Sequence, residues 1–398
     1  MAYQQTAALS PLFPPETLDE IVSMLDTVDL KSCSLAAQRL SRPAQTVLFR
    51  DISVMHRKDA VGLAPGETFL TEEEDLAYTI GAYTRLRDVL LSSPHLKTHI
   101  RVVSLSAYVQ SVAIVADMDL PRLSDITLVG PGDRPTLDGP LVPSLTRLIA
   151  LPSLRRLYLR SDFDPSIFAD CSSSLQELVL DRVRPKKPWN EWAPSTAHER
   201  PALKRIQLLE EEDDEQDSQD DEDEDEDESD RSALAWLLHP TSPFVLTGIE
   251  ELVIFGPMTV PAYLLIQCAA PSIQRLEIGP TEFIENVNLA PLSELQFLRL
   301  YVTNTVDLAI LFDPLVHLVR STRTNKIRTI CFQILEFSAA DMTAEVEAEL
   351  CRFYRHFKQL HAAGALPSLQ PVGLPLLPHP WGRDPAVRAM FQRARNVM

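Results

Sequence analysis

Histidine and cysteine are the residues whose spacing most directly indicates metal or nucleophilic chemistry. His95 and His99 lie four residues apart, as two ligands on one helix face would, and His356 and His361 form a second pair. Neither pair has a further Cys or His at a spacing that would complete a tetrahedral site. We therefore expect no metal and no cofactor to bind at these histidines.

Other catalytic motifs are also missing from the sequence. Only 12 glycines occur, and they form neither a phosphate-binding loop nor a G-x-S-x-G nucleophile turn. The basic stretch of Arg184, Lys186 and Lys187 is too short to indicate a nucleic-acid patch. The sequence thus predicts a protein without catalytic residues, which binds other proteins and not nucleic acid.

The cysteines and the longest apolar runs bear on the compartment. Five cysteines are scattered without a Cys-x-x-Cys pair, which favours reduced thiols in the cytoplasm or nucleus. No apolar run is as long as a membrane span, and the first ten residues lack the basic and apolar regions of a secretory signal. We expect no membrane association.

The charge is concentrated in one segment. The net charge is −19, but residues 210–230 hold 17 acidic residues and no basic one, so the remaining chain is nearly neutral. A block of like charge without apolar residues cannot bury enough surface to order itself, so we expect a disordered loop. It would either be a solvated spacer or dock a basic partner protein.

One six-residue pattern recurs along the middle of the chain: apolar, two variable, apolar, one variable, apolar. Its last two apolar residues lie two apart, which places them on one side of a short strand. Successive copies begin 21 to 46 residues apart, mostly near the 20–29 residues of a leucine-rich repeat. The nine copies are Ile100–Leu105, Leu123–Leu128, Leu154–Leu159, Leu175–Leu180, Leu203–Leu208, Ile249–Ile254, Ile273–Ile278, Leu295–Leu300 and Ile327–Phe332.

This pattern predicts parallel strands joined by crossover connections, some of them helical. Residues 261–269, 306–319 and 231–238 are the clearest helical connections, and a separate helix is expected from Thr71 to about Leu91. The residue between the last two apolar positions would face away from the core. We select Tyr158, Gln207, Glu277 and Arg299 among these outward positions as candidate contacts to a protein substrate.

Residues 12–54 predict three short helices followed by an extended segment. Leu18, Ile21, Val22 and Leu25 recur at helical spacing after Pro14 and Pro15, which suit a first helical turn. Asp29 is the expected cap of the second helix, and Ser41 with Pro43 would open the third. Such a small bundle leaves apolar surface for a partner or for the next domain to cover.

The N-terminal segment resembles the F-box-like domain of fungal (basidiomycete-type) proteins. The residues that carry the resemblance are Leu12 with Pro14, Pro15 and Glu16, then Ile21, Leu25, Asp29–Leu30, Cys33–Leu35 and Leu48–Arg50. The resemblance implies docking on the Skp-type adaptor of a cullin–RING ubiquitin ligase, with adaptor contacts from Leu12, Pro14, Pro15, Ile21, Leu25, Leu30 and Leu35. A plain helical cap on a larger domain is the alternative.

The nine copies resemble the irregular leucine-rich repeats that follow F-boxes in this family. The expected fold is therefore α/β, with an F-box-like bundle at 10–55, a linker and helix at 56–94 and a repeat solenoid at 95–340. An ordinary α/β domain with similar strands is the alternative. Residues 341–398 would form a capping helix and a proline-rich tail.

Together these features favour a substrate-recognition subunit of a ubiquitin ligase of the SCF type. The bundle would bind the adaptor and its cullin complex, and the solenoid would bind an unknown protein substrate. A scaffold or chaperone that binds basic proteins through the acidic loop is the second hypothesis, and an enzyme is the third.

Overall fold

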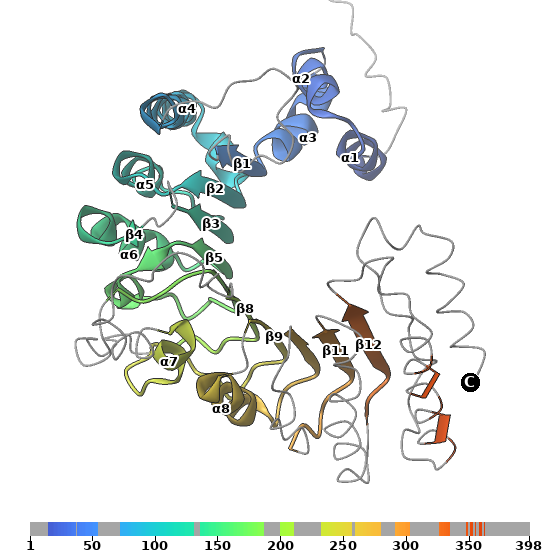
Figure 1. Ribbon diagram of the computed structural model, residues 1–398. Helices are drawn as coiled ribbons and strands as arrows, with labels where there is room; N and C mark the ends of the chain where they lie inside the picture. The colour runs from blue at the N-terminus through green and yellow to red at the C-terminus, as the bar shows by residue number, and fades with distance from the viewer. Residues whose placement is uncertain are drawn as a thin grey trace, which may run out of the picture. The chain divides into compact units, whose positions relative to one another are not determined.

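The computed structural model describes most of the first 300 residues and parts of the remainder (Figure 1). The described ranges are 15–36, 38–54, 72–130, 136–186, 200–210, 232–256, 259–279, 291–302 and 326–334, with seven isolated positions between 348 and 362. The fold is mixed α/β, and the chain divides into two compact units, residues 1–133 and 134–398. This division falls inside the 95–340 segment that the sequence predicts as one repeat region.

The first unit begins with a three-helix bundle: α1 (Pro15–Ser23), α2 (Thr27–Ala36) and α3 (Gln38–Leu48). Val22, Leu30 and Ala44 supply one core residue from each helix. The cap of α2 is Asp26, whose carboxylate accepts the Val28 and Asp29 amides at 2.9 and 2.8 Å. The predicted cap, Asp29, is wrong, since it lies in the first turn.

The third helix also begins earlier than predicted. It starts at Gln38, three residues before Ser41, and includes Pro43 within the helix. Proline has no amide to donate to the preceding turn, but the helix continues through it to Leu48. The Thr46 hydroxyl donates to the Arg42 carbonyl at 2.9 Å in this stretch. Proline is therefore a poor marker of where this helix starts.

The rest of the first unit is a parallel sheet with helices. The strands β1 (Asp51–Val54), β2 (Val102–Ser106) and β3 (Asp125–Val129) pair in that order, with Ile52 opposite Val103 and Val103 opposite Ile126. The helix α4 (Glu72–Ser92) confirms the prediction for residues 71–91, and Pro94 starts the 3-10 turn η2 (Pro94–Thr98). Tyr83 of α4 is buried, and its hydroxyl donates to the Ser104 carbonyl at 2.9 Å. The helix α5 (Val109–Ala116) follows β2.

The second unit contains seven further parallel strands in chain order. They are β5 (Arg156–Arg160), β7 (Glu177–Asp181), β8 (Arg205–Leu209), β9 (Glu251–Phe255), β10 (Arg275–Gly279), β11 (Phe297–Val302) and β12 (Thr329–Ile334). Ahead of each strand from β7 to β12, the carbonyl of the residue just before the preceding strand accepts two successive amides. Gln176, for example, accepts Lys204 and Arg205 at 2.8 and 3.0 Å.

Short helices and turns connect the strands of the second unit. They are η3 (Gly139–Leu141), α6 (Val142–Ile149), η4 (Pro165–Phe168), α7 (Ala233–Leu238) and α8 (Val260–Ala269), and a two-stranded sheet pairs β4 (Thr136–Leu137) with β6 (Asp162–Phe163). Figure 1 shows α7 and α8 on the same side of the strands. On that side Trp236 packs edge-on against Phe163 and Phe244, with ring centroids 4.9 and 5.6 Å apart.

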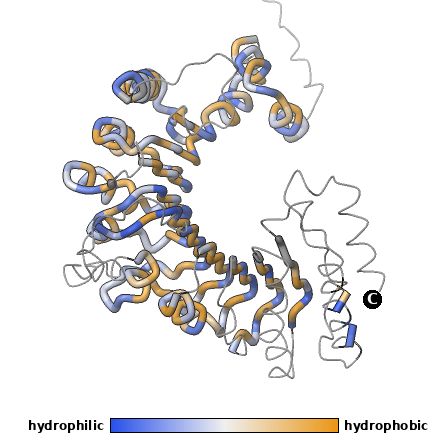
Figure 2. The backbone as a smooth tube through the Cα atoms, viewed as in Figure 1, coloured by the Kyte–Doolittle hydropathy of each residue, from blue (hydrophilic) through white to orange (hydrophobic). Residues whose placement is uncertain are grey.

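The six-residue pattern marks the strands and their buried side chains. Each of the nine copies overlaps one strand, and all three apolar positions are buried in the first eight copies. Figure 2 shows hydrophobic residues along these strands and on the helices beside them. The predicted crossover helices at 231–238 and 261–269 are present as α7 and α8. The parallel α/β prediction is thus confirmed.

Some predicted elements lie outside the described residues, and two observed helices were not predicted. The helix at 306–319, nearly all of the acidic segment and the proline-rich tail are not described. Of the predicted capping helix, only isolated positions such as Arg352 and Lys358 are described, and these are helical. The sequence did not predict α5 and α6, each of eight residues. Within the described ranges, no helix has the length and apolar character needed to cross a membrane.

Candidate functional site

Many of the strand side chains on the side of the second unit's sheet that faces away from the core are polar, although Val179 and Phe255 lie among them; we call this side the polar face. Because side chains alternate along a strand, residues two apart share this face. The first outward position of five neighbouring strands is charged, and the register aligns these residues across the sheet. In spatial order they are Arg156, Glu177, Arg205, Glu251 and Arg275, which alternate in sign.

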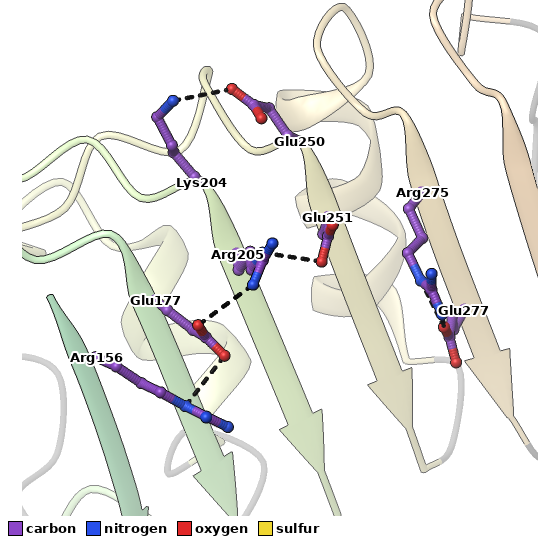
Figure 3. A network of polar contacts seen from close by, with 8 residues as sticks. All are labelled: Arg156, Glu177, Lys204, Arg205, Glu250, Glu251, Arg275 and Glu277. Carbon is purple, nitrogen blue, oxygen red and sulfur yellow. Dashed lines mark hydrogen bonds and ion pairs between the residues drawn. The ribbon is translucent and has the colours of Figure 1, made fainter. Parts of the chain in front are cut away.

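This charged row is joined by ion pairs (Figure 3). Glu177 lies between Arg156 and Arg205, with nitrogen–oxygen distances of 3.1 and 3.6 Å. Arg205 also reaches Glu251 at 3.0 Å. Neighbouring strands lie about 4.8 Å apart, so opposite charges at aligned positions meet without strand distortion. The row therefore holds its own side chains in place and presents both signs of charge.

At β10 the pairing differs, because Arg275 pairs with Glu277 of its own strand, and Glu277 accepts hydrogen bonds from two further side chains. Arg275 donates to the Glu277 carboxylate through Nε at 2.8 Å, and Arg299 of β11 donates through Nη1 at 3.1 Å. The Tyr301 hydroxyl donates to the same carboxylate at 2.9 Å. Only 5% of Glu277 is exposed. A carboxylate this buried needs such charged and hydroxyl donors, so Glu277 fixes three side chains of the face.

Aromatic rings support the same cluster. The Arg275 guanidinium lies over the Phe297 ring at 4.2 Å from its centroid, and Arg299 lies 5.3 Å from that centroid. Phe255 meets Tyr301 edge-on, with 5.4 Å between the centroids. Burial and the neighbouring Glu277 carboxylate raise the pKa of the Tyr301 phenol, so this hydroxyl keeps its proton for donation at neutral pH.

A second carboxylate on the face has a similar set of partners. Asp181 at the end of β7 accepts the Tyr158 hydroxyl and lies 3.8 Å from Arg160 and 3.6 Å from Arg182. Burial and the hydrogen bond to Asp181 raise the pKa of the Tyr158 phenol. Both sites combine one buried carboxylate with a tyrosine hydroxyl and two guanidinium groups. The side chains around Glu277 and around Asp181 are therefore held in fixed positions on the polar face.

The predicted substrate contacts all lie on this face, with one correction. Tyr158, Gln207 and Arg299 are partly exposed, as expected for contact residues. Glu277 was expected at the surface but is buried, because long side chains from its own and the adjacent strand cover it. It positions Arg275 and Arg299 and offers little surface of its own.

Sequence reasoning missed all five residues of the charged row. The expected contacts came from only one outward position in each strand. The position two residues earlier has the same orientation and carries Arg156, Glu177, Arg205, Glu251 and Arg275. The period of two was a sufficient signal for these residues.

A different surface lies on the helical bundle of the first unit. Four large apolar side chains are exposed there: Ile21 at 44%, Met24 at 76%, Val28 at 70% and Leu35 at 88%. Val28 and Leu35 are seven residues apart in α2 and therefore lie on one face of that helix. Four exposed apolar side chains on so small a bundle are a candidate surface for binding a partner. Met24 and Val28 were not among the predicted contacts.

The predicted adaptor contacts divide into three groups in the structure. Ile21 and Leu35 are exposed, whereas Leu25 is half-buried and packs against the bundle core. Leu30 is only 4% exposed, because it fills the centre of the bundle; its expected role in docking is corrected to a role in folding. Pro15 starts α1, while Leu12 and Pro14 lie outside the described residues.

Potential metal ligands and buried nucleophiles are the remaining groups to consider in the described part of the chain. No three His, Cys, Asp or Glu side chains among those residues are placed to hold a metal ion. Cys171 is buried, and burial raises the pKa of its thiol to about 12, which suppresses the nucleophilic thiolate.

Comparison with known proteins gives no further guide to this chain. No family model matches the sequence, and no curated protein matches it significantly.

Proposed function

We propose that the protein is the substrate-recognition subunit of a ubiquitin ligase of the SCF type. In this proposal the F-box-like bundle docks on a Skp-type adaptor, which links it to the cullin. The observation that carries the proposal is the set of exposed apolar side chains on the bundle, Ile21, Met24, Val28 and Leu35. Burial of apolar surface of this kind is the main driving force of most protein–protein association.

The polar strand face supports the second half of the proposal, which is binding of a protein substrate. The strands would belong to an irregular leucine-rich-repeat solenoid that uses this face for recognition. Arg156, Arg205 and Arg275 are partly exposed, and their partner carboxylates hold them in place. Preorganised side chains lose less conformational entropy on binding, which favours recognition. Catalysis would come from holding the substrate near a ubiquitin-charged enzyme.

Two experiments test the two halves separately. The full chain should co-purify with a Skp-type adaptor and a cullin, and Ile21→Asp with Leu35→Asp should abolish this. A photoreactive residue in place of Gln207, on the strand face, should cross-link to captured substrate. The same residue in place of Leu264, an exposed position on α8, is the matched control. Failure of the full chain to bind the adaptor would refute the docking half of the proposal. Equal cross-linking from positions 207 and 264 would refute the substrate-binding half.

A scaffold that binds basic proteins is the second candidate, and the acidic segment at 210–230 is the observation that favours it. Its 17 acidic residues would attract basic proteins over a distance set by the salt concentration. Deleting residues 211–230 should then abolish capture of such partners. Under the ubiquitin-ligase proposal, the same deletion leaves adaptor binding unchanged.

A further inference from the structure

The described part of the first unit contains a cluster of basic side chains around His99. Its members are Arg42, His95, His99, Arg101 and Arg122, which we call the His99 cluster. All of them are exposed except His99, which is half-buried. The cluster joins α3, η2 and the segments that lead into β2 and β3. It is separate from the polar strand face and is not used in the proposed function.

Hydrogen bonds on the α3 side bring two members together. The Thr46 hydroxyl lies 3.4 Å from His99 Nδ1. The same hydroxyl donates to the carbonyl of Arg42, one helical turn earlier, at 2.9 Å. Residues four apart share a helix face, so Arg42 lies on the face of α3 that meets His99.

The strand ends bring the other arginines to the same place. The Arg101 amide donates to the Arg50 carbonyl at 2.9 Å, and the Arg101 carbonyl accepts the Ser124 amide at 2.8 Å. Arg122 precedes Ser124 by two residues. Arg101 and Arg122 therefore stand at the amino ends of neighbouring strands, next to His99.

All the charged groups that act on His99 are basic. Burial and then the charges of His95, Arg42, Arg122 and Arg101 lower the pKa of His99. No carboxylate is among the groups that shift it, and within the described residues Arg42, Arg101 and Arg122 form no ion pair. Three unpaired guanidinium groups repel one another unless an anion is bound between them.

We propose that the His99 cluster binds an acidic segment of a partner protein. Each arginine can hold a carboxylate through two parallel hydrogen bonds, so three or four Asp or Glu side chains would neutralise the cluster. Nucleic acid fits less well, because the cluster contains no Phe, Tyr or Trp ring and only two imidazoles on which a base could stack.

The test uses the full chain and a fluorescent peptide with six glutamates, with affinity measured by fluorescence anisotropy at low salt. Arg42→Gln, Arg101→Gln and Arg122→Gln together should weaken binding at least about tenfold. A matched triple variant, Arg85→Gln, Arg155→Gln and Arg328→Gln, removes the same charge at other exposed sites and should change affinity by less than about twofold. Equal affinities in the two variants would overturn the proposal.

Two further measurements distinguish the partner class and the site. A single-stranded oligonucleotide of equal charge should bind more weakly than the peptide, and tighter binding would overturn the choice of a protein partner. Bound carboxylates should raise the pKa of His99 in wild type, which a nuclear magnetic resonance titration measures. The variant with Arg42, Arg101 and Arg122 replaced should not show this rise. A His99 titration unchanged by peptide would also refute the assignment. Deleting residues 211–230 removes the chain's own acidic segment. The shortened chain should bind the peptide as tightly as wild type or more tightly, and the Arg42, Arg101 and Arg122 substitutions should weaken that binding again. This result would support the assignment.

Discussion

Tyr301 of β11 packs directly on Gly279 of β10. A Cβ atom at Gly279 would stand 2.7 and 2.8 Å from two ring atoms of Tyr301 and even closer to the Tyr301 Cβ. The glycine therefore makes the room that Tyr301 needs to reach Glu277, to which its hydroxyl donates at 2.9 Å. This contact links the backbone of one strand to the polar cluster on the next.

Replacing this glycine should disturb both stability and the cluster. We expect Gly279→Ala to lower the free energy of unfolding by about 1–3 kcal/mol, because the Tyr301 side chain or its strand must shift. Gly81→Ala is the matched control, since its nearest neighbour is the end of Arg85 at 3.6 Å and alanine favours a helix. Urea denaturation measures both. An unchanged Gly279→Ala protein would show that the close packing is not required.

Removal of the Glu277 carboxylate should cost more than removal of an exposed one. Glu277→Ala leaves two partly exposed guanidinium groups and a phenol without their shared acceptor, and we expect a loss of about 2 kcal/mol, as for hydrogen bonds to a charged group. Glu250→Ala breaks an exposed pair with Lys204 at 3.2 Å and should cost less than about 1 kcal/mol. The same denaturation assay compares the two. Equal losses would mean that Glu277 does not organise the face.

The cap of α2 gives a prediction within the bundle. Asp26→Ala removes the acceptor of two amides and should destabilise α2 by about 1 kcal/mol, whereas Asp29→Ala should have a much smaller effect. Hydrogen exchange of the α2 amides reports this locally, without requiring the whole chain to unfold together. Faster exchange after Asp29→Ala than after Asp26→Ala would restore Asp29 as the cap.

The cysteines should differ sharply in reactivity. With a pKa of about 12, Cys171 holds only roughly one thiolate in ten thousand at pH 8, and this fraction rises with pH toward that value. Cys268 is exposed and should react first. Iodoacetamide labelling with mass spectrometry measures each site. Modification of Cys171 in the folded protein as fast as Cys268 would contradict its burial.

The regular part of the fold could be predicted from the sequence because one physical pattern repeats. Leu157 and Leu159, like their equivalents in other strands, are two residues apart and buried on one side. The helices α5 and α6 were missed because eight residues make barely two turns, too few for a helical period to stand out. Parallel pairing could be predicted because parallel strands need crossover connections, and the segments between the copies are long enough to supply them.

The candidate site could be predicted only in part, because burial depends on neighbours distant in the sequence. Nothing local to Glu277 indicates that Arg299 and Tyr301, 22 and 24 residues later, will cover it. Leu30 and Leu35 look alike in the sequence, yet one lies in the bundle core and the other is exposed. Which face of a short helix packs inward is decided by the other helices.

The affinity of the full chain for a Skp-type adaptor tests the central claim most directly. Calorimetry would compare wild type, the bundle variant Ile21→Asp with Leu35→Asp, and a control variant, Tyr78→Asp with Leu91→Asp, at exposed positions on α4. We predict that wild type and control bind alike and that the bundle variant binds at least about tenfold more weakly. No binding by wild type, or equal binding by all three folded proteins, would contradict the account.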